Sequence, residues 1–110
     1  MKQVIAFVQP FMVQKVVDAL HAIHGLSGAS FAEVRGFGRG RSAKGDEETL
    51  LGTTLRLRVD VMVPDPLVDA VVQAIRVAAH TGHRGDGKIY VAGLERAIRI
   101  STGEEGESAV

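Results

Sequence analysis

The most regular pattern in the chain is the alternation of apolar and polar positions over residues 53–63. One set of alternate positions is aliphatic throughout: Leu55, Leu57, Val59, Val61 and Val63. The other set is mixed: Thr54, Arg56, Arg58, Asp60 and Met62. Because successive side chains of a strand point to opposite faces, the pattern predicts a strand with one buried face. Shorter runs of β-branched or aromatic residues predict three more strands, at 3–8, 29–37 and 88–94.

Two other segments repeat apolar residues at the three- and four-residue spacing of a helix. The first follows Pro10 and extends to Ile23, and Gly25 is expected to mark its C-terminal end. The second ends near Ala79, and Asp65 is expected to cap its N-terminus. The sequence therefore predicts two amphipathic helices, each of which follows a strand.

The predicted order is strand, helix, strand, strand, helix, strand, with a short fifth strand at 96–101. This is the order of the ferredoxin-like fold, of class α+β, in which an antiparallel sheet carries both helices on one face. The second face of the 53–63 strand then meets either water or another subunit. We expect one domain over residues 1–110, with a flexible loop at about 38–53 and a C-terminal tail at about 101–110.

The composition excludes several classes of function. The formal net charge of the 110 residues is zero, so no broad basic field indicates nucleic-acid binding. There is no cysteine, which excludes disulfides and thiol chemistry and fits a cytoplasmic protein. No apolar run approaches the roughly 18 residues of a membrane span, and the first apolar run is too short for a signal peptide. We expect no nucleic-acid partner and no direct insertion into a membrane.

The segment 81–90, TGHRGDGKIY, places three glycines beside Lys88 just before a predicted strand. Glycines let a ligand approach the main chain, and successive backbone N–H groups can hold an anion that a lysine neutralises. The segment therefore predicts a phosphate cradle. The spacing from Gly82 to Lys88 fits a P-loop, but Ile89 stands where that motif needs serine or threonine, and a strand follows instead of a helix. The simpler alternative is an ordinary connection made of two turns.

Two further basic segments favour the same chemistry. Residues 35–41 place three arginines among glycines at a strand end, and Arg99 lies near the C-terminus. Cations from three separate segments favour a single anionic ligand, and a nucleotide fits. Two histidine pairs have a three-residue spacing that can hold a metal on a helix, His21 with His24 and His80 with His83. Surface histidines without a metal are the simpler interpretation, and no residue is assigned a catalytic role.

Four stretches together resemble the PII signal-transduction proteins, the nitrogen regulatory protein P-II family. They are EVRGFGR at 33–39, VPDPLVD at 63–69, TGHRGDGKIYV at 81–91 and AIRISTGEEGESAV at 97–110. The similarity covers nearly the whole chain, which looks like a divergent, PII-like member. The resemblance implies a homotrimer whose sheets face inward, with ATP or ADP bound as an allosteric ligand in clefts between subunits. It also implies a mobile T-loop that docks onto a membrane transporter, a metabolic enzyme or a sensor kinase.

The resemblance assigns roles position by position. The GDGK residues would hold the phosphates, Arg99 would reach them from the last strand, Ser30 replaces a threonine near the ribose, and Phe7 would lie near the base. The nucleotide-binding set that it implies is Gly28, Ser30, Gly36, Phe37, Gly38, Arg39, Met62, Gly85, Asp86, Gly87, Lys88 and Arg99. The partner-binding loop that it implies contains Gly40, Arg41, Ser42, Lys44, Asp46, Glu47, Glu48, Leu50 and Leu51.

Departures from the family pattern predict a changed sensor. Gly40 stands where nitrogen-sensing members have a glutamine that helps to bind magnesium and 2-oxoglutarate, and Ser101 replaces a phosphate-binding arginine. The loop has no tyrosine, so uridylylation in the family's usual manner is excluded, although the hydroxyl groups of Ser42, Thr49 and Thr53 remain for other modification. We predict a non-enzymatic regulator that binds adenine nucleotide, with or without Mg²⁺, and that does not sense 2-oxoglutarate.

Four alternatives stay open at this point. The chain is a standard nitrogen regulator that binds 2-oxoglutarate in spite of these changes, or it regulates the transport of inorganic carbon or metals, with bicarbonate as a second effector. From other classes of protein, it is a small enzyme that hydrolyses a nucleotide, or a ferredoxin-like module that binds a metal through its histidines. Titration with 2-oxoglutarate, a phosphate-release assay and titration with metals separate these alternatives.

Overall fold

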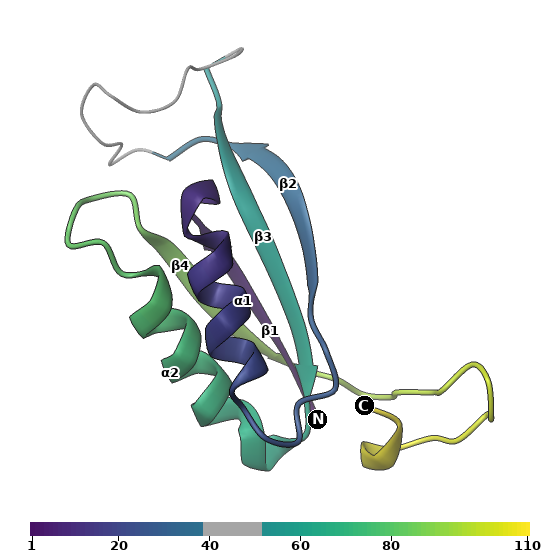
Figure 1. The fold of residues 1–110 in the computed structure, drawn as a ribbon. Coiled ribbons are helices and arrows are strands. Elements are labelled where there is room, and N and C mark those ends of the chain that lie inside the picture. Colours follow the sequence, from purple (N-terminus) through teal and green to yellow (C-terminus); the bar gives the residue numbers. More distant parts are fainter. Residues whose placement is uncertain (39–51) are drawn as a thin grey trace.

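The computed structural model describes residues 1–38 and 52–110. Four strands form one antiparallel sheet in the order β2-β3-β1-β4. Their bounds are β1 Lys2–Val8, β2 Ser30–Gly36, β3 Thr54–Val63 and β4 Gly87–Gly93. Both helices, α1 Val13–His21 and α2 Val68–Ala79, cover the same face of the sheet (Figure 1). The predicted ferredoxin-like order is confirmed, and each predicted strand of the sheet lies within one residue of its observed bounds.

The hydrophobic core lies between the sheet and the two helices. The alternation in β3 predicted one buried face, and every second residue from Leu57 to Val63 is indeed buried. Val4, Ala6 and Val8 bring the same face of β1 into the core. The helices contribute Val16, Leu20, Val71, Ile75 and Ala79. Within residues 1–38 and 52–110 the opposite face of the sheet carries no helix, and we call it the open face.

The strand register shows which side chains share the open face. Phe7 in the middle of the sheet pairs with Arg58 of β3 on one side and with Lys88 of β4 on the other. The Arg58 guanidinium lies 5.7 Å from the centre of the Phe7 ring, within reach of a cation–π contact. Asp60, two residues further along β3, accepts a hydrogen bond of 2.8 Å from Arg58 Nε and one of 3.2 Å from Gln3.

The open face therefore holds a small polar network among apolar and aromatic side chains. The hydrogen bonds from Arg58 lower the pKa of Asp60, against a partial burial that acts to raise it. Tyr90 lies edge-on to Phe7, with 6.3 Å between the ring centres, and is half exposed. Met62 is 39% exposed on the same face. Such a mixture of side chains, which no described helix covers, is better suited to contact with another protein surface than to contact with water.

Two local predictions are wrong, the helix cap at Asp65 and the end of the first helix. Asp65 makes no side-chain cap on α2; it opens the 3-10 turn η2, Asp65–Leu67, and its carboxylate accepts a 2.7 Å hydrogen bond from the amino group of Met1. That bond is the largest of the effects that lower the pKa of Asp65. The first helix also ends at His21, although Ile23 still packs against the core. The helix follows a 3-10 turn, η1 Pro10–Met12. Its C-terminal cap residue is Ala22, and Gly25, with φ +91°, lies three residues further along the chain.

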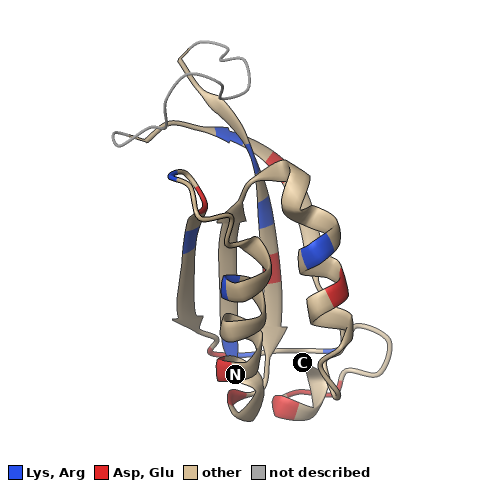
Figure 2. Ribbon diagram, turned by 60° about the vertical axis from the view of Figure 1, so that its left-hand side comes forward, with Lys and Arg blue, Asp and Glu red and all other residues tan. Residues whose placement is uncertain are grey.

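The predicted fifth strand at 96–101 is absent from the described part of the chain. Residues 94–110, which we call the C-terminal arm, fold back on themselves through one bridge between Ile98 and Glu105. The Arg99 N–H donates to the Glu104 carbonyl at 2.8 Å, and the arm ends in the 3-10 turn η3, Glu107–Ala109. The arm projects beyond the sheet at the end that holds both termini (Figure 1). Acidic residues gather at this end of the molecule (Figure 2).

No helix in the described ranges is long and apolar enough to cross a lipid bilayer.

Candidate nucleotide-binding site

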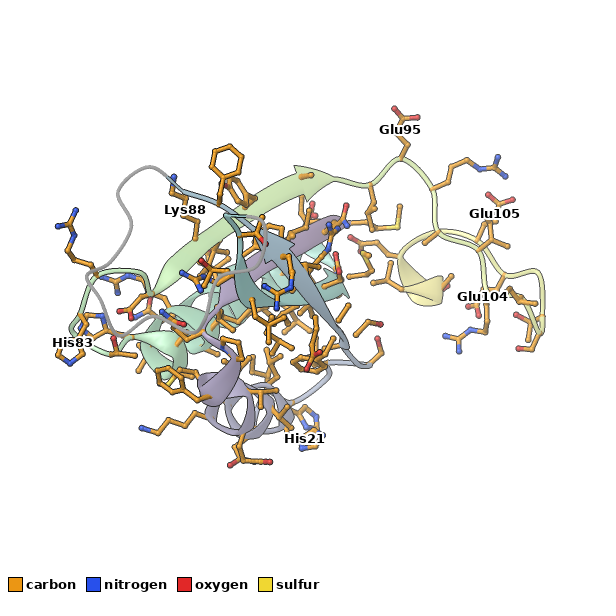
Figure 3. The ribbon with its side chains drawn as sticks, turned by 90° about the horizontal axis from the view of Figure 1, so that it is seen from above. His21, His83, Lys88, Glu95, Glu104 and Glu105 are labelled. Atoms are coloured by element: carbon orange, nitrogen blue, oxygen red, sulfur yellow. The ribbon has the colours of Figure 1, made fainter. Side chains whose placement is uncertain are left out.

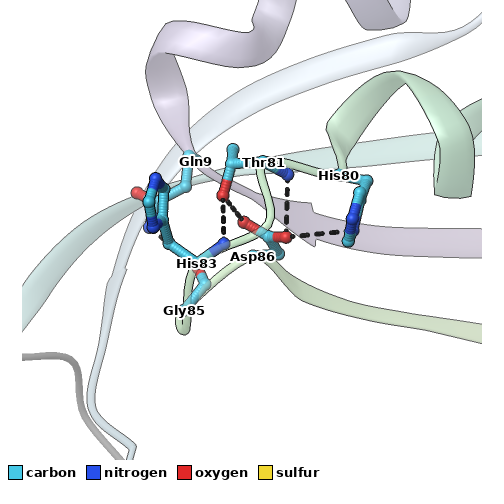
Figure 4. Close-up of polar contacts among 6 residues, drawn as sticks. All are labelled: Gln9, His80, Thr81, His83, Gly85 and Asp86. Atoms are coloured by element: carbon cyan, nitrogen blue, oxygen red, sulfur yellow. Dashed lines mark hydrogen bonds and ion pairs between the residues drawn. The ribbon is translucent and has the colours of Figure 1, made fainter.

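The glycine-rich turn between α2 and β4 is held together by the carboxylate of Asp86 (Figure 4). One carboxylate oxygen accepts a 2.9 Å hydrogen bond from the backbone N–H of Thr81, and the other accepts a short one from the Thr81 hydroxyl. The Thr81 hydroxyl oxygen in turn accepts the N–H of His83 at 3.1 Å. Gln9 ties the turn to the end of β1 by donating to the Gly85 carbonyl at 2.8 Å. Asp86 therefore positions the turn, whereas the resemblance placed it among the ligand-binding residues.

The electrostatics of the turn agree with this role. Partial burial acts to raise the pKa of Asp86, but the hydrogen bonds from the Thr81 hydroxyl and from backbone N–H groups outweigh it, and the pKa is lowered. His80 adds to the lowering, since its Nδ1 lies 3.5 Å from the carboxylate. Asp86 is thus ionised at neutral pH and engaged by its own turn.

Gly87 brings the turn unusually close to β1. Its φ is +111°, and a Cβ atom on it would lie only 1.7 Å from the Phe7 carbonyl oxygen. Only glycine can occupy this position without moving the backbone of β4 away from β1. At Gly87 the group that approaches closely is the protein's own strand β1, and the approach of a ligand to this turn stays a prediction.

Lys88 follows at the start of β4 and extends over the open face beside Phe7 (Figure 3). Within the described residues, its ammonium has no hydrogen-bond or ion-pair partner. A hollow of about 380 Å³ runs beside the turn, with buried Ile75 and Ala79 in its lining. Arg76, His80 and Lys88 border the same hollow. The described chain therefore offers basic side chains next to a glycine-rich backbone, which is the chemistry that holds a phosphate group.

The remaining predicted residues lie at different levels along the sheet. Gly36, Phe37 and Gly38 lie at and beyond the end of β2, at the same end as the glycine-rich turn. Met62 lies toward the other end, level with Gln3 and Ala92, and Arg99 lies in the arm beyond it. Ser30 begins the edge strand β2, level with Ile5 in the middle of β1, and Gly28 precedes it. Strand β4 alone separates Lys88 from Gly93 by about 17 Å, at 3.3–3.4 Å per residue.

Arg99 is also engaged within the C-terminal arm. Its guanidinium lies 3.3 Å from a Glu104 carboxylate oxygen and donates to the Ser108 carbonyl at 3.1 Å. Figure 3 shows Glu104 and Lys88 at opposite ends of the molecule. One chain therefore does not bring Arg99 to the phosphate cradle. Arg39 and the whole predicted partner-binding set from Gly40 to Leu51 lie outside the described residues.

Sequence reasoning missed two residues that build the cradle. Thr81 supplies two donors to Asp86, and Gln9 fixes the Gly85 carbonyl. A threonine five residues before an aspartate in a glycine-rich turn was a usable signal, since both side chains commonly close turns through the backbone. Nothing local pointed to Gln9, whose partner is 76 positions away. As for metals, no group of three or more ligating side chains occurs in the part of the chain that the structure describes.

Comparison with known proteins agrees with this architecture. The family model for nitrogen regulatory protein P-II matches residues 1–104. Nitrogen regulatory protein P-II of Haemophilus influenzae is 45% identical, over the full length of both chains. The P-II protein of Azospirillum brasilense and nitrogen regulatory protein GlnK of Escherichia coli are 39% and 40% identical, again over the full length of both chains. The chain therefore belongs to the P-II family of nitrogen regulatory signalling proteins.

Proposed function

We propose that the protein is a homotrimeric regulator that binds ATP or ADP in clefts between subunits and thereby controls a partner protein. The observation that carries the proposal is the separation of the predicted ligand residues along the sheet. A single chain offers phosphate-binding groups, Gly87 and Lys88, at one end, whereas the proposed base-binding residue Met62 lies toward the other end and Ser30 begins the edge strand β2. A second copy whose far end meets the cradle of the first would complete one site.

The open face supports the same assembly. Apolar and aromatic side chains lie there around the Arg58–Asp60 pair, and an antiparallel sheet normally covers such a face with a partner. Trimers are typical of the family. In a ring of three copies each open face would be covered, and each cradle would meet the C-terminal arm of a neighbour, with Arg99 as the second phosphate-binding cation.

The regulated partner is proposed from family membership, as a membrane transporter or a metabolic enzyme. Residues 40–51, which contain the predicted contact set, would respond to the bound nucleotide and change the affinity for that partner. The protein is proposed to be cytoplasmic and to have no enzyme activity of its own. Asp86, the carboxylate beside the cradle, is occupied by Thr81 and is a poor general base for a water molecule.

The direct test is a calorimetric titration of ADP and of ATP into the protein and into Lys88→Ala. Loss of a charge-assisted contact to phosphate should weaken binding by about 1.5–3 kcal/mol, or about tenfold or more. Lys15→Ala is the matched control, since Lys15 is an exposed lysine on α1, outside the proposed site. Wild-type affinity in Lys88→Ala, or equal losses in both variants, would refute the assignment of the cradle. A parallel phosphate-release assay should show no turnover of ATP.

A further inference from the structure

His80 makes a contact with the turn that neither its sequence position nor the family match explains. It is the C-terminal cap residue of α2, and its Nδ1 lies 3.5 Å from the Asp86 oxygen that accepts the Thr81 N–H. Figure 4 shows the imidazole and the Thr81 N–H approaching this oxygen from two different directions. The imidazole ring is 72% exposed.

The proton on His80 changes the nature of this contact. A neutral imidazole whose Nδ1 lacks a proton presents a lone pair to the carboxylate, whereas an imidazolium presents an N–H donor with a full positive charge. Histidine side chains change charge between about pH 5 and pH 8, which includes the physiological range. The end of α2 also favours a cation, because the backbone carbonyl oxygens point toward the C-terminus of a helix and give it a partial negative charge.

Other charged groups lie around the same hollow and on the same turn, and they set limits on the effect. Arg76 lies one helical turn earlier on α2, and Lys88 borders the same hollow from β4. His83 and Arg84 belong to the same turn. These four groups oppose a further positive charge, and Asp86 is the one described carboxylate that lines the hollow and favours it. The gain from protonation is therefore that of an exposed ion pair and not of a buried one.

We propose that His80 is a positioning residue for the phosphate cradle, and that its imidazolium form holds the Asp86 carboxylate in the orientation that orders Thr81 to Lys88. The affinity for a phosphate-bearing ligand then rises as the pH falls through the range in which histidine gains its proton. This rests on the proposed nucleotide function. His80 touches no ligand in the proposal and acts through Asp86.

The first experiment requires no nucleotide. The backbone amide signal of Thr81, followed by NMR from pH 8 to pH 5.5, should shift with the same midpoint as the His80 ring, because both share one carboxylate. In His80→Gln this titration of the Thr81 amide should disappear, whereas in His21→Gln, a distant exposed histidine on α1, it should persist. A Thr81 amide that titrates equally in His80→Gln would overturn the coupling.

The second experiment measures ADP affinity at pH 8 and at pH 6 in the same three proteins. The terminal phosphate of ADP also gains a proton near about pH 6, so only the difference between wild type and His80→Gln is informative. Wild type should gain about two- to fivefold in affinity relative to His80→Gln at pH 6, and little at pH 8. Parallel pH profiles in these two proteins would overturn the proposal. If wild type bound no ADP at any pH while Thr81 still titrated with His80, the nucleotide function would fail and the His80 contact would stand.

Discussion

The lack of space for a side chain at Gly87 gives a prediction of definite size. Gly87 pairs with Val8 across the β1–β4 ladder, and its φ of +111° belongs to a region that residues with a Cβ rarely adopt. Replacing Gly87 with alanine would place the new Cβ 1.7 Å from the Phe7 carbonyl oxygen and 2.8 Å from the Phe7 carbonyl carbon. Both neighbouring atoms are backbone, so no side-chain rotation can relieve the overlap.

The cost follows from the shift that the overlap demands. Real Cβ contacts essentially never fall below 3.0 Å, so the start of β4 would have to move away from β1 by at least about 1.3 Å. Hydrogen bonds of about 2.9 Å in this part of the ladder would then exceed 3.5 Å and be lost, at about 1 kcal/mol each. Backbone strain adds about 1–3 kcal/mol. We expect Gly87→Ala to lower the free energy of unfolding by about 3–5 kcal/mol, a large part of a typical 5–15 kcal/mol.

The control is Gly93→Ala at the other end of the same strand. No atom lies within 4 Å of the position that a Cβ on Gly93 would take, and its φ is not positive, so alanine should change stability by less than about 1 kcal/mol and in the stabilising direction. Both variants and wild type are unfolded in urea at one protomer concentration, since assembly shifts apparent stability. Equal unfolding midpoints for Gly87→Ala and Gly93→Ala would refute the close approach of the turn to β1.

Three further predictions test other parts of the account. Asp86→Asn should reduce the acid dependence of stability, because the lowered pKa of Asp86 contributes stability that is present above its ordinary value of 3.8 and is lost as the pH falls; an unchanged dependence of the urea midpoint between pH 5 and pH 3 would contradict this. Ile5→Asp places a second carboxylate beside Asp60 on the open face, where assembly would bury it. Light scattering should therefore give the mass of a trimer for wild type and of a monomer for the variant. A monomeric wild type at micromolar concentration would contradict the proposed assembly. Titration of 2-oxoglutarate into the ATP-loaded protein should give no heat of binding, since Gly40 offers no side-chain oxygen for a metal. Micromolar binding would contradict this and indicate a standard nitrogen sensor that responds to 2-oxoglutarate.

The fold was largely predictable because its determinants are periodic and local. The alternation from 54 to 63 and the helical spacing in α2 describe how each element meets one core, so the class of fold followed from the order of the elements. The prediction of a short fifth strand was wrong because its outcome depends on where the chain turns after it. Residues 96–101 were predicted as a short strand, but the chain reverses beyond them, where Gly103 and Gly106 have positive φ, and the arm pairs with itself.

The composition of the candidate site was also predictable, but its geometry was not. The glycines and Lys88 indicated a cradle, whereas the internal use of Asp86 by Thr81 depends on how the turn closes. The separation of Met62 and Arg99 from Lys88 depends on strand register, which no local pattern contains. Asp65 shows the same limit, since its partner is the amino group at the far end of the chain.

The central claim is that each nucleotide site combines Lys88 of one subunit with Arg99 of the next. Lys88→Ala and Arg99→Ala trimers, each deficient in ADP binding, can be unfolded together, refolded as a one-to-one mixture and titrated with ADP. If the two residues come from neighbouring subunits, about a quarter of the clefts regain both wild-type side chains, because each cleft draws its two subunits at random in a ring. The account predicts tight ADP binding with about this fraction of the wild-type stoichiometry. A mixture that binds no better than the two variants alone would contradict the shared site, because both residues would then have to act from the same chain.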